Sequence, residues 1–469
     1  MQNLQQISEA AIAKAKEILA AAPTEDPVRK DITGATTGIA AYNLEPVGVL
    51  LQPVITPLVN MIPRVANTRG GTSAEWRLIQ SIINGATFEP FPGSSNPSNR
   101  LSYNWAPKTA AFAPLGVGDR VEWDSIDASK TFEDVKARAV TNALFALKII
   151  QEQVVLFGRI ADLGSITTPT VTTSNSGGTI ATPAGTYNLK VRAIVGMGNG
   201  TNTRGKISAA ANWTLTGPNG SITAYTDPVA GASSYEWYVD DGNGGAYTLQ
   251  TTTGNSSVKL IALTTSGTVA PANNVANANA YDGILPLLTA NAPATNIKTL
   301  AKDVTAGLGT DFTLDDLDAL NLAVWDNAKG DPDVIIAGSK ACARLTNLWL
   351  AANGGPVSYV VPDASALSSL TGGYRLTRYV NKITGKPSVV ITHPNMPDGM
   401  LMALTFQIPF PTGGDQSGIE VEYSRGYQQV DYARVARRDD FEVYSRECLK
   451  LKFVGGGWLL TNASSKTTA

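Results

Sequence analysis

Few residues in this chain could perform acid–base or nucleophilic chemistry, and they are isolated from one another. The only histidine is His393, in the turn-like segment Thr392–Gly399, so any Ser–His or Cys–His couple would need this side chain. A zinc site of the HExxH type needs two histidines and is excluded. A loop histidine directly before proline is typical of a structural role. Cys342 and Cys448 are 106 positions apart with no CxxC pair, which fits two small buried residues in a reducing compartment.

Other motifs that could bind phosphate, calcium or a shared proton are incomplete. The glycine-rich segment 196–200 falls between two predicted strands, so it is predicted to be a hairpin loop and not the strand-to-helix turn of a dinucleotide site. The Asp-Asp-Gly-Asn-Gly segment 240–244 lacks the alternating ligands and closing Glu of an EF-hand, which favours a tight hairpin turn. The acidic pairs Asp315/Asp316 and Asp439/Asp440 are sequence neighbours that need not point together. We therefore predict no catalytic residue, no cofactor and no metal, and a protein that is not an enzyme.

Length and charge set further limits. The chain has 469 residues, enough for about two to four cores, and its formal net charge is −2. No region has the basic excess that phosphate binding normally requires, so sequence-specific DNA recognition is not expected. The segment Met1–Ala22 lacks the basic head and apolar core of a signal peptide and fits a short amphipathic helix. No stretch approaches the roughly 20 apolar residues needed to cross a bilayer, so we predict a soluble, cytoplasmically made protein with no membrane partner.

The segment Ser165–Tyr281 differs in composition from the sequence on either side. It has nine charged residues in 117, against 67 in the other 352. Strict alternation in Tyr187–Ala193 predicts a half-buried strand. Regularly spaced turn signals predict further strands at Ala210–Leu215, Ser221–Tyr225, Ser234–Val239, Ala246–Gln250 and Ser257–Ile261. This pattern indicates an all-β sandwich inserted into a host fold. The stretch Thr226–Val239 resembles immunoglobulin-like and fibronectin-type modules, and the lack of a disulfide pair excludes an antibody-type domain.

Upstream, the host sequence predicts an extended arm and a long β ribbon. Four prolines between Pro46 and Pro63 interrupt any helix there. Strand-like runs at Ser73–Ile83 and Leu101–Val121 flank a turn-rich segment. A ribbon of two strands is marginal alone in water, so its aromatic side chains are expected to pack on another subunit. The alternative is a hairpin folded back on its own domain. The predicted inter-subunit residues here are Trp76, Phe88, Phe91, Tyr103 and Trp105.

The rest of the host sequence predicts a long helix and a mixed α/β region. Apolar residues recur at helical spacing from Thr131 to Phe157, with Glu152 placed off the apolar stripe, and Gly158 is placed to end the helix. A capping box at Thr313–Asp316 opens another helix, and Asp331-Pro-Asp333 turns into the apolar strand 334–337. Strands dominate after residue 374. The charge-dense segment Glu422–Lys452 includes Arg437, Arg438, Asp439 and Asp440, which form either a solvated strand face or inter-subunit ion pairs.

The serial order of these elements resembles the major capsid proteins of tailed bacteriophages, which have the Hong Kong 97-like fold. The segment Gly71–Trp76 and the strand that follows look like the family's extended loop. Ile150–Gly158 resembles the end of its spine helix, and Asp282–Leu285 resembles the step that follows it. Phe312–Leu317 with Gly330–Asp333 looks like the opening of its axial domain. The resemblance implies an α+β Hong Kong 97-like capsid fold with an all-β insertion.

This resemblance also implies a domain organisation. Residues 1–63 would form the N-terminal helix and arm, 64–121 the extended β loop, and 122–164 the peripheral domain with its spine helix. Residues 165–281 would be the insertion, 282–418 the axial domain, and 419–469 the return strands of the peripheral domain with the C-terminal tail. Because Gly158 and Gly283 are neighbouring landmarks in the family's plain form, the insertion is expected to have adjacent ends.

The implied function is a structural major capsid protein. Copies would assemble into hexamers and pentamers of an icosahedral shell around phage double-stranded DNA, contacted without sequence specificity. A portal and scaffold or decoration proteins would be further partners, and the protein would belong to the virion capsid after assembly in the bacterial cytoplasm. In some relatives a loop lysine forms a covalent link to an asparagine of another subunit, and Lys108 lies in the corresponding element. Removal of an N-terminal segment by a protease is not expected.

Two other readings remain open on the sequence. An encapsulin-type nanocompartment would share the fold but carry cargo enzyme in place of a genome. An adhesive or carbohydrate-binding protein would use the β module as its active part and would remain a monomer or small oligomer.

Overall fold

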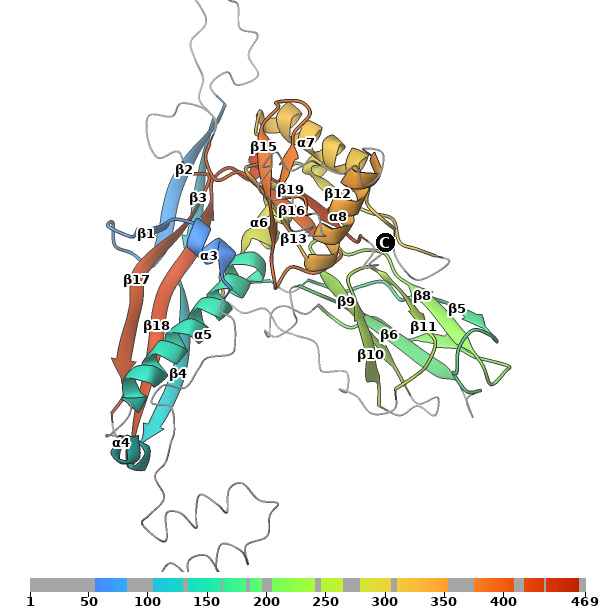
Figure 1. The fold of residues 1–469 in the computed structure, drawn as a ribbon, viewed down its shortest axis with the longest axis horizontal. Helices are drawn as coiled ribbons and strands as arrows, with labels where there is room; N and C mark the ends of the chain where they lie inside the picture. Colours follow the sequence, from blue (N-terminus) through green and yellow to red (C-terminus); the bar gives the residue numbers. More distant parts are fainter. Residues whose placement is uncertain are drawn as a thin grey trace, which may run out of the picture. The chain divides into compact units, whose positions relative to one another are not determined.

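The computed structural model describes residues 55–81, 104–129, 134–161, 163–182, 186–195, 205–240, 246–264, 279–304, 310–352, 375–408, 417–433 and 436–463. The chain divides into two compact units, one of residues 1–53 and 127–134 and one of residues 54–126 and 135–469. The contacts below all lie within the second unit (Figure 1). Most of the predicted N-terminal helix and arm lies outside the described residues.

A four-stranded peripheral sheet packs against the long helix. Its strand order is β1 (Arg64–Ala66), β17 (Ile419–Asp431), β18 (Arg438–Leu451) and β4 (Ala113–Glu122), with β1 parallel to β17 and the other pairs antiparallel. Helix α5 (Val135–Phe157) lies along β4 and β18 (Figure 1). The buried residues between them are Val121, Ala143, Leu147, Phe441 and Val443. The apolar stripe therefore predicted the packing face correctly, although residues 131–133 lie outside the described part and the short helix α4 (Trp123–Ser129) was not predicted.

Helix α5 corrects two expectations from the sequence. It has 23 residues with a mean hydropathy of 1.3 in its most apolar window, so by length and composition it could cross a membrane. The sequence had been expected to contain no such stretch. Gln151 and Glu152 are nevertheless buried, at 1% and 0% exposure, and both are hydrogen-bonded. Glu152 is thus not on the polar side of the helix. These contacts and the packing on β4 and β18 are those of a core helix.

The predicted run Leu101–Val121 is two strands and not one. Strand β3 (Asn104–Ala111) pairs with β2 (Ser73–Ser81) in an antiparallel ribbon, whereas β4 leaves the ribbon and joins β18. The break occurs at Phe112, which is buried against Ala74 and Cys448. Burying this ring fixes the point at which the chain passes from the ribbon to the sheet.

The axial region is a six-stranded mixed sheet covered on both faces. Its order is β12 (Ile297–Thr299), β19 (Trp458–Thr461), β16 (Leu401–Leu404), β13 (Val334–Ala337), β15 (Pro387–Thr392) and β14 (Arg378–Val380). Helices α7 (Leu314–Ala328) and α8 (Ser339–Ala352) contribute to one apolar cluster with Ile335 and Trp458. Helix α6 (Ile284–Asn291) contributes to another with Ile336 and Met402. Burial on both faces explains why β13 reads as an unbroken apolar run.

The C-terminal segment has a different place from the predicted one. Residues 419–469 were assigned to the peripheral domain and a tail, yet β19 lies between β12 and β16 of the axial sheet, parallel to β12. All four residues of β19 are buried. Their apolar side chains fill both faces of the sheet, which a solvent-exposed tail could not achieve. The short 3-10 helices η1 (Ala294–Asn296) and η3 (Val454–Gly456) precede β12 and β19, and the capping box at Thr313 and Asp316 is present.

The segment 165–281 forms two sheets of its own. One has the order β10 (Thr248–Thr253), β9 (Ser234–Val239), β6 (Tyr187–Ile194) and β7 (Ala211–Trp213). The other has the order β11 (Ser257–Leu260), β8 (Ser221–Tyr225) and β5 (Thr170–Ser174). Among the described strands these ladders stay within the segment. Alternation and turn signals together predicted six of the strands. They missed β5, whose side chains are mostly exposed.

Candidate functional site: assembly surfaces and the junction behind them

The two faces of the β2–β3 ribbon differ in exposure. On one face Trp76 and Lys108 are directly opposite each other and partly buried. On the other face Ile79 and Trp105 are directly opposite each other and are 51% and 53% exposed. In the part of the chain that the structure describes, β2 and β3 pair only with each other. A ribbon of two strands is marginal in water, so an exposed Ile–Trp pair on it calls for a further apolar surface.

The base of the ribbon, by contrast, is part of a core. Ala74 and Phe112 enclose Cys448 of β18, and these three residues are 2%, 4% and 0% exposed. The Lys450 ammonium lies 5.7 Å from the centre of the Trp76 ring. Burial raises the pKa of the Cys448 thiol to about 12, and the nearby Glu447 and Glu420 carboxylates act in the same direction. The ribbon is therefore anchored at its base.

The sequence-predicted contact residues are placed differently from one another. Trp105 is exposed and Trp76 is partly buried over Lys450 of its own chain. Phe88, Phe91 and Tyr103 lie outside the described residues. A single chain does not test an inter-subunit role, so that role stays a prediction for all five.

The charged group at the start of β18 is largely engaged within its own chain. Asp439 is 9% exposed and accepts hydrogen bonds from Lys136 Nζ at 3.2 Å and from Trp123 Nε1 at 3.3 Å. Arg438 Nε donates to Asp440 Oδ2 at 3.1 Å, and Arg437 is exposed. Their inter-subunit role also stays a prediction. The same holds for a covalent link at Lys108, whose Nζ donates to Asn291 Oδ1 of the same chain at 3.2 Å.

Behind the ribbon, a buried carboxylate joins three separate parts of the chain. The Glu152 oxygens accept hydrogen bonds from Leu58 N and Val59 N, both at 2.8 Å, at the start of helix α3 (Pro57–Met61). His393 Nε2 lies 2.6 Å from Glu152 Oε1, while His393 Nδ1 accepts from Asn395 N at 3.1 Å. Because Nδ1 accepts a hydrogen bond, the ring hydrogen is on Nε2, and Nε2–H donates a hydrogen bond to the carboxylate. Helix α5, the N-terminal segment and the axial loop are thus tied at one point.

A second buried carboxylate, Glu447 of β18, forms a further network that includes Gln151, the residue before Glu152 on α5. Glu447 is fully buried and accepts from Gln151 Nε2 and Arg64 Nη2, both at 2.6 Å, and from the Tyr281 hydroxyl at 3.3 Å. The Arg64 guanidinium also lies 4.0 Å from the centre of the Tyr427 ring. Burial, reinforced by Glu447, raises the pKa of the Tyr281 phenol well above its ordinary value. This network joins strand β1, helix α5 and the end of the insertion at Tyr281.

The two ends of the insertion meet where α5 ends. Gly283 N donates to Gly158 O at 2.8 Å. A Cβ at Gly158 would lie 2.6 Å from Val154 O, and a Cβ at Gly283 would lie 2.6 Å from the same oxygen. Both positions therefore need glycine for close backbone approach. The expected adjacency of the two ends is observed.

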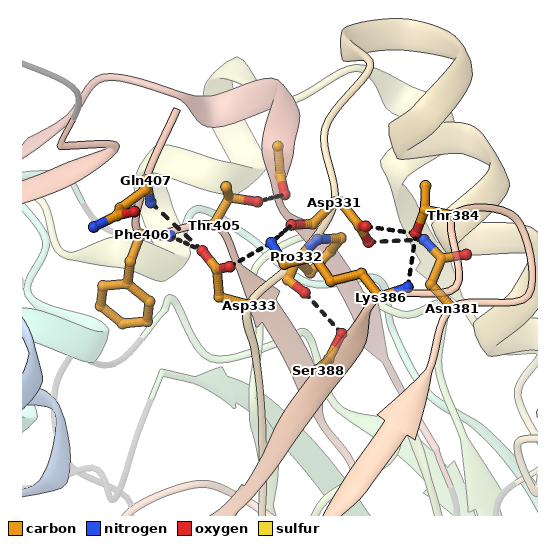
Figure 2. Close-up of polar contacts among 11 residues, drawn as sticks. Asp331, Pro332, Asp333, Asn381, Thr384, Lys386, Ser388, Thr405, Phe406 and Gln407 are labelled. Atoms are coloured by element: carbon orange, nitrogen blue, oxygen red, sulfur yellow. Dashed lines mark hydrogen bonds and ion pairs between the residues drawn. The ribbon is translucent and has the colours of Figure 1, made fainter. Parts of the chain in front are cut away.

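The turn Asp331–Asp333, between α7 and β13, fixes the edge of the axial sheet (Figure 2). Asp331 is buried and accepts from Asn381 Nδ2 at 2.9 Å and Thr384 Oγ1 at 2.5 Å, which close the β14–β15 turn. Asp333 accepts from Lys386 Nζ at 2.5 Å and from Phe406 N at 2.8 Å, just after β16. The two carboxylates therefore hold the ends of β13, β15 and β16 and the β14–β15 turn in one arrangement.

None of these groups is arranged for catalysis in the part of the chain that is described. His393 and Glu152 are 1% and 0% exposed and bonded to structural partners. Burial raises the pKa of both thiols, Cys342 and Cys448, so neither is a thiolate near neutral pH. No cluster of three or more His, Cys, Asp or Glu side chains that could hold a metal occurs among the residues searched. These buried groups instead join segments that are far apart in the sequence.

Comparison with known families gives this arrangement a role. The family model of the SU10 major capsid protein matches residues 260–452. The match begins at the last residue of β11, includes the axial strands other than β19 and ends just after β18. This region is therefore similar to a major capsid protein. The match confirms the predicted capsid-protein recognition, the structural, non-enzymatic role and the location in the virion capsid. It does not test the predicted immunoglobulin-like insertion, most of which precedes residue 260. The described helices and mixed sheets have the α+β class that was predicted from the order of elements.

Solved structures resemble the capsid protein over nearly its whole length, at low similarity. One described as Mycobacterium phage Bobi has 11% identity and a TM-score of 0.43, covering 92% of this chain and 97% of that chain. The capsid of a native GTA particle has 9% identity and a TM-score of 0.42, with coverage of 91% and 95%. The holo-SrpI encapsulin complex from Synechococcus elongatus PCC 7942 has 12% identity and a TM-score of 0.40, with coverage of 92% and 95%. A search of curated proteins gives no match.

Proposed function

We propose that copies of this capsid protein assemble as hexamers and pentamers into an icosahedral shell that encloses phage double-stranded DNA. The observation that carries the proposal is the ribbon, which is anchored at its base but leaves Ile79 and Trp105 exposed as an opposed pair. Repeated apolar contacts between copies would bury this pair. The net charge of −2 fits a container that touches DNA without sequence-specific contacts.

The remaining parts of the proposal concern organisation and partners. Residues 165–281 form an outward-projecting, immunoglobulin-like insertion domain, and the other boundaries follow those predicted, with two refinements. Residues 113–122 belong with the peripheral sheet, and 458–461 with the axial sheet. Besides other copies of itself, the protein meets a portal and scaffold or decoration proteins, and assembly takes place in the bacterial cytoplasm.

The test is electron microscopy of the purified protein with a ribbon variant. Wild-type protein is expected to form particles tens of nanometres across with local six-fold clusters. Trp105→Glu places a charge on the exposed face and is expected to abolish particles while leaving the folded monomer intact by circular dichroism. The matched control is Ile261→Glu, since Ile261 lies in the insertion and is similarly exposed at 56%. Persistent wild-type monomers, or particles of normal yield from Trp105→Glu, would contradict the proposal.

The contents of the particles separate the remaining alternatives. Particles isolated from infected cells should contain double-stranded DNA. Cargo enzyme without a genome would favour an encapsulin-type compartment. A stable monomer that binds glycans would favour the adhesive or carbohydrate-binding reading.

A further inference from the structure

The last described residues of the chain contact the insertion. Asn462 follows strand β19 and has a left-handed backbone, with φ of 63°. Its Oδ1 accepts from Ser256 N of the turn between β10 and β11 at 2.6 Å, and its Nδ2 donates to Leu300 O, next to β12, at 2.7 Å. Asn462 is 4% and Ser256 is 0% exposed. A single side chain therefore bridges the insertion and the axial sheet in a buried position.

The backbones of the two parts approach closely beside this bridge. A Cβ on Gly254, in the same β10–β11 turn, would lie 2.9 Å from Gly399 N, and a Cβ on Gly399 would lie 2.2 Å from Gly254 O. Ala463 N donates to Gly399 O at 3.0 Å, so the segment after β19 also holds the loop that contacts this turn. Only glycine at 254 and 399 permits this approach.

A second contact lies at the same end of the insertion. Lys302 Nζ, beyond β12, is 2.6 Å from Asp227 Oδ1 and 5.2 Å from the centre of the Tyr225 ring at the end of β8. Thr226 N donates to Ser256 O at 2.9 Å, so this contact and the Asn462 bridge belong to one structural element. With two attachment points, the insertion cannot rotate about a single contact with the axial domain.

The bridge continues into the core of the insertion. Thr253 Oγ1 donates to Asn255 O at 2.7 Å and accepts from Trp237 Nε1 at 2.8 Å. Trp237 is fully buried between the two sheets of the insertion, and it belongs to the same apolar cluster as Ile336 and Met402 of the axial sheet. The β10–β11 turn is thus also held by hydrogen bonds to its own side of the contact.

We infer that the insertion is locked to the axial domain as one rigid body, with Asn462 as the bridging residue. It is not a pendant module joined only by its two chain crossings. The orientation of the insertion is set by the segment after β19, which lies far from it in sequence. One consequence rests on the proposed function: in a shell, every copy of the insertion would have the same fixed orientation relative to its axial domain.

The first test is hydrogen exchange on the full-length chain kept unassembled at low concentration. The Ser256 amide is expected to be protected, and Asn462→Gly is expected to speed its exchange about tenfold, since a buried hydrogen bond is lost. Glycine accepts the left-handed backbone at 462, so the substitution removes only the side-chain bridge. The matched control is Asn175→Gly, because the Asn175 side chain forms hydrogen bonds with Thr216, which also lies in the insertion. Its Ser256 exchange should equal that of the wild type.

A second test does not depend on a variant of the lock. Spin labels at Lys259→Cys in the insertion and Leu322→Cys on α7 lie on exposed positions, whereas native Cys342 and Cys448 are buried. Labelled chain diluted into unlabelled chain should give one narrow distance distribution, and adding Asn462→Gly should broaden it. A broad wild-type distribution, or Ser256 exchange unchanged by Asn462→Gly, would overturn the lock. Because neither measurement requires particles, failure to form shells would count against the proposed function alone.

Discussion

The axial sheet and the β2–β3 ribbon are both built from hydrogen-bonded strands, but they obtain their stability in different ways. In the axial sheet, β13, β16 and β19 are buried along their whole length, and alternate side chains enter two separate apolar clusters. In the ribbon, burial is confined to the base around Phe112, and Ile79 and Trp105 face solvent. The sheet buries its apolar side chains within one chain, whereas the ribbon leaves an opposed Ile–Trp pair exposed.

Two tryptophans express this difference in a form that can be tested. Trp458 of β19 is fully buried and donates Nε1–H to Asn321 Oδ1 at 2.9 Å. Trp105 of the ribbon is 53% exposed. The same side chain should therefore matter for folding in one place and for association in the other.

The largest expected effect is at Trp458. Trp458→Ala should lower the free energy of unfolding by about 3–5 kcal/mol. The substitution leaves a large cavity between α7 and the sheet and removes the hydrogen-bond donor to the buried Asn321 Oδ1. Urea unfolding of the unassembled chain measures the change. A loss below about 1 kcal/mol would mean that the axial sheet is not the self-sufficient core described above.

Glu152 comes next, because it joins the stable part to the segment that leads to the ribbon. Glu152→Ala should cost about 3 kcal/mol, since two amides of α3 and the His393 ring lose a buried acceptor. Exposed Glu75→Ala is the control and should change stability by less than about 0.5 kcal/mol. Increased proteolysis within residues 55–66 of Glu152→Ala would show that the junction holds this segment. Equal effects of the two substitutions would rule the junction out.

The base of the ribbon should show its core character at high pH. Burial raises the folded-state pKa of the Cys448 thiol from its ordinary value of 9.0 to about 12. Its contribution to stability is therefore fully present below about pH 9 and is lost as the pH rises toward 12. Cys448→Ala should flatten this decline in unfolding free energy between pH 9 and 12. Burial also raises the pKa of the Cys342 thiol, so Cys342→Ala provides a comparison profile from outside the ribbon base. An unchanged profile in Cys448→Ala would indicate an open ribbon base.

The smallest effect on folding is expected at the exposed face of the ribbon. Trp105→Ala should change the unfolding free energy of the unassembled chain by less than about 0.5 kcal/mol, because little apolar area is buried there. The same variant should raise the protein concentration needed for assembly, measured by light scattering. A stability loss comparable to that of Trp458→Ala would erase the contrast between the two regions.

Local signals in the sequence predicted much of this structure. The strands 221–225, 234–239 and 334–337 have the predicted bounds, as does the capping box at Thr313, because alternation, apolar runs and capping chemistry depend on near neighbours. Glu152 was noted as an acidic residue before an apolar run and a glycine, but its burial was not predicted. Helical periodicity reports which side chains are apolar, and it does not report that α3 and His393 supply donors from 94 and 241 residues away.

Local sequence features were enough to predict the composition break at Ser165–Tyr281, the types of most elements and the order that resembles a capsid protein. The partners of each element became clear only from the folded chain. It moved residues 113–122 from the ribbon to the peripheral sheet, placed β19 inside the axial sheet and brought Asn462 to Ser256. The physical reason is that periodicity records how much of a side chain must be buried, whereas strand partners and buried hydrogen bonds are chosen by packing between segments far apart in the chain.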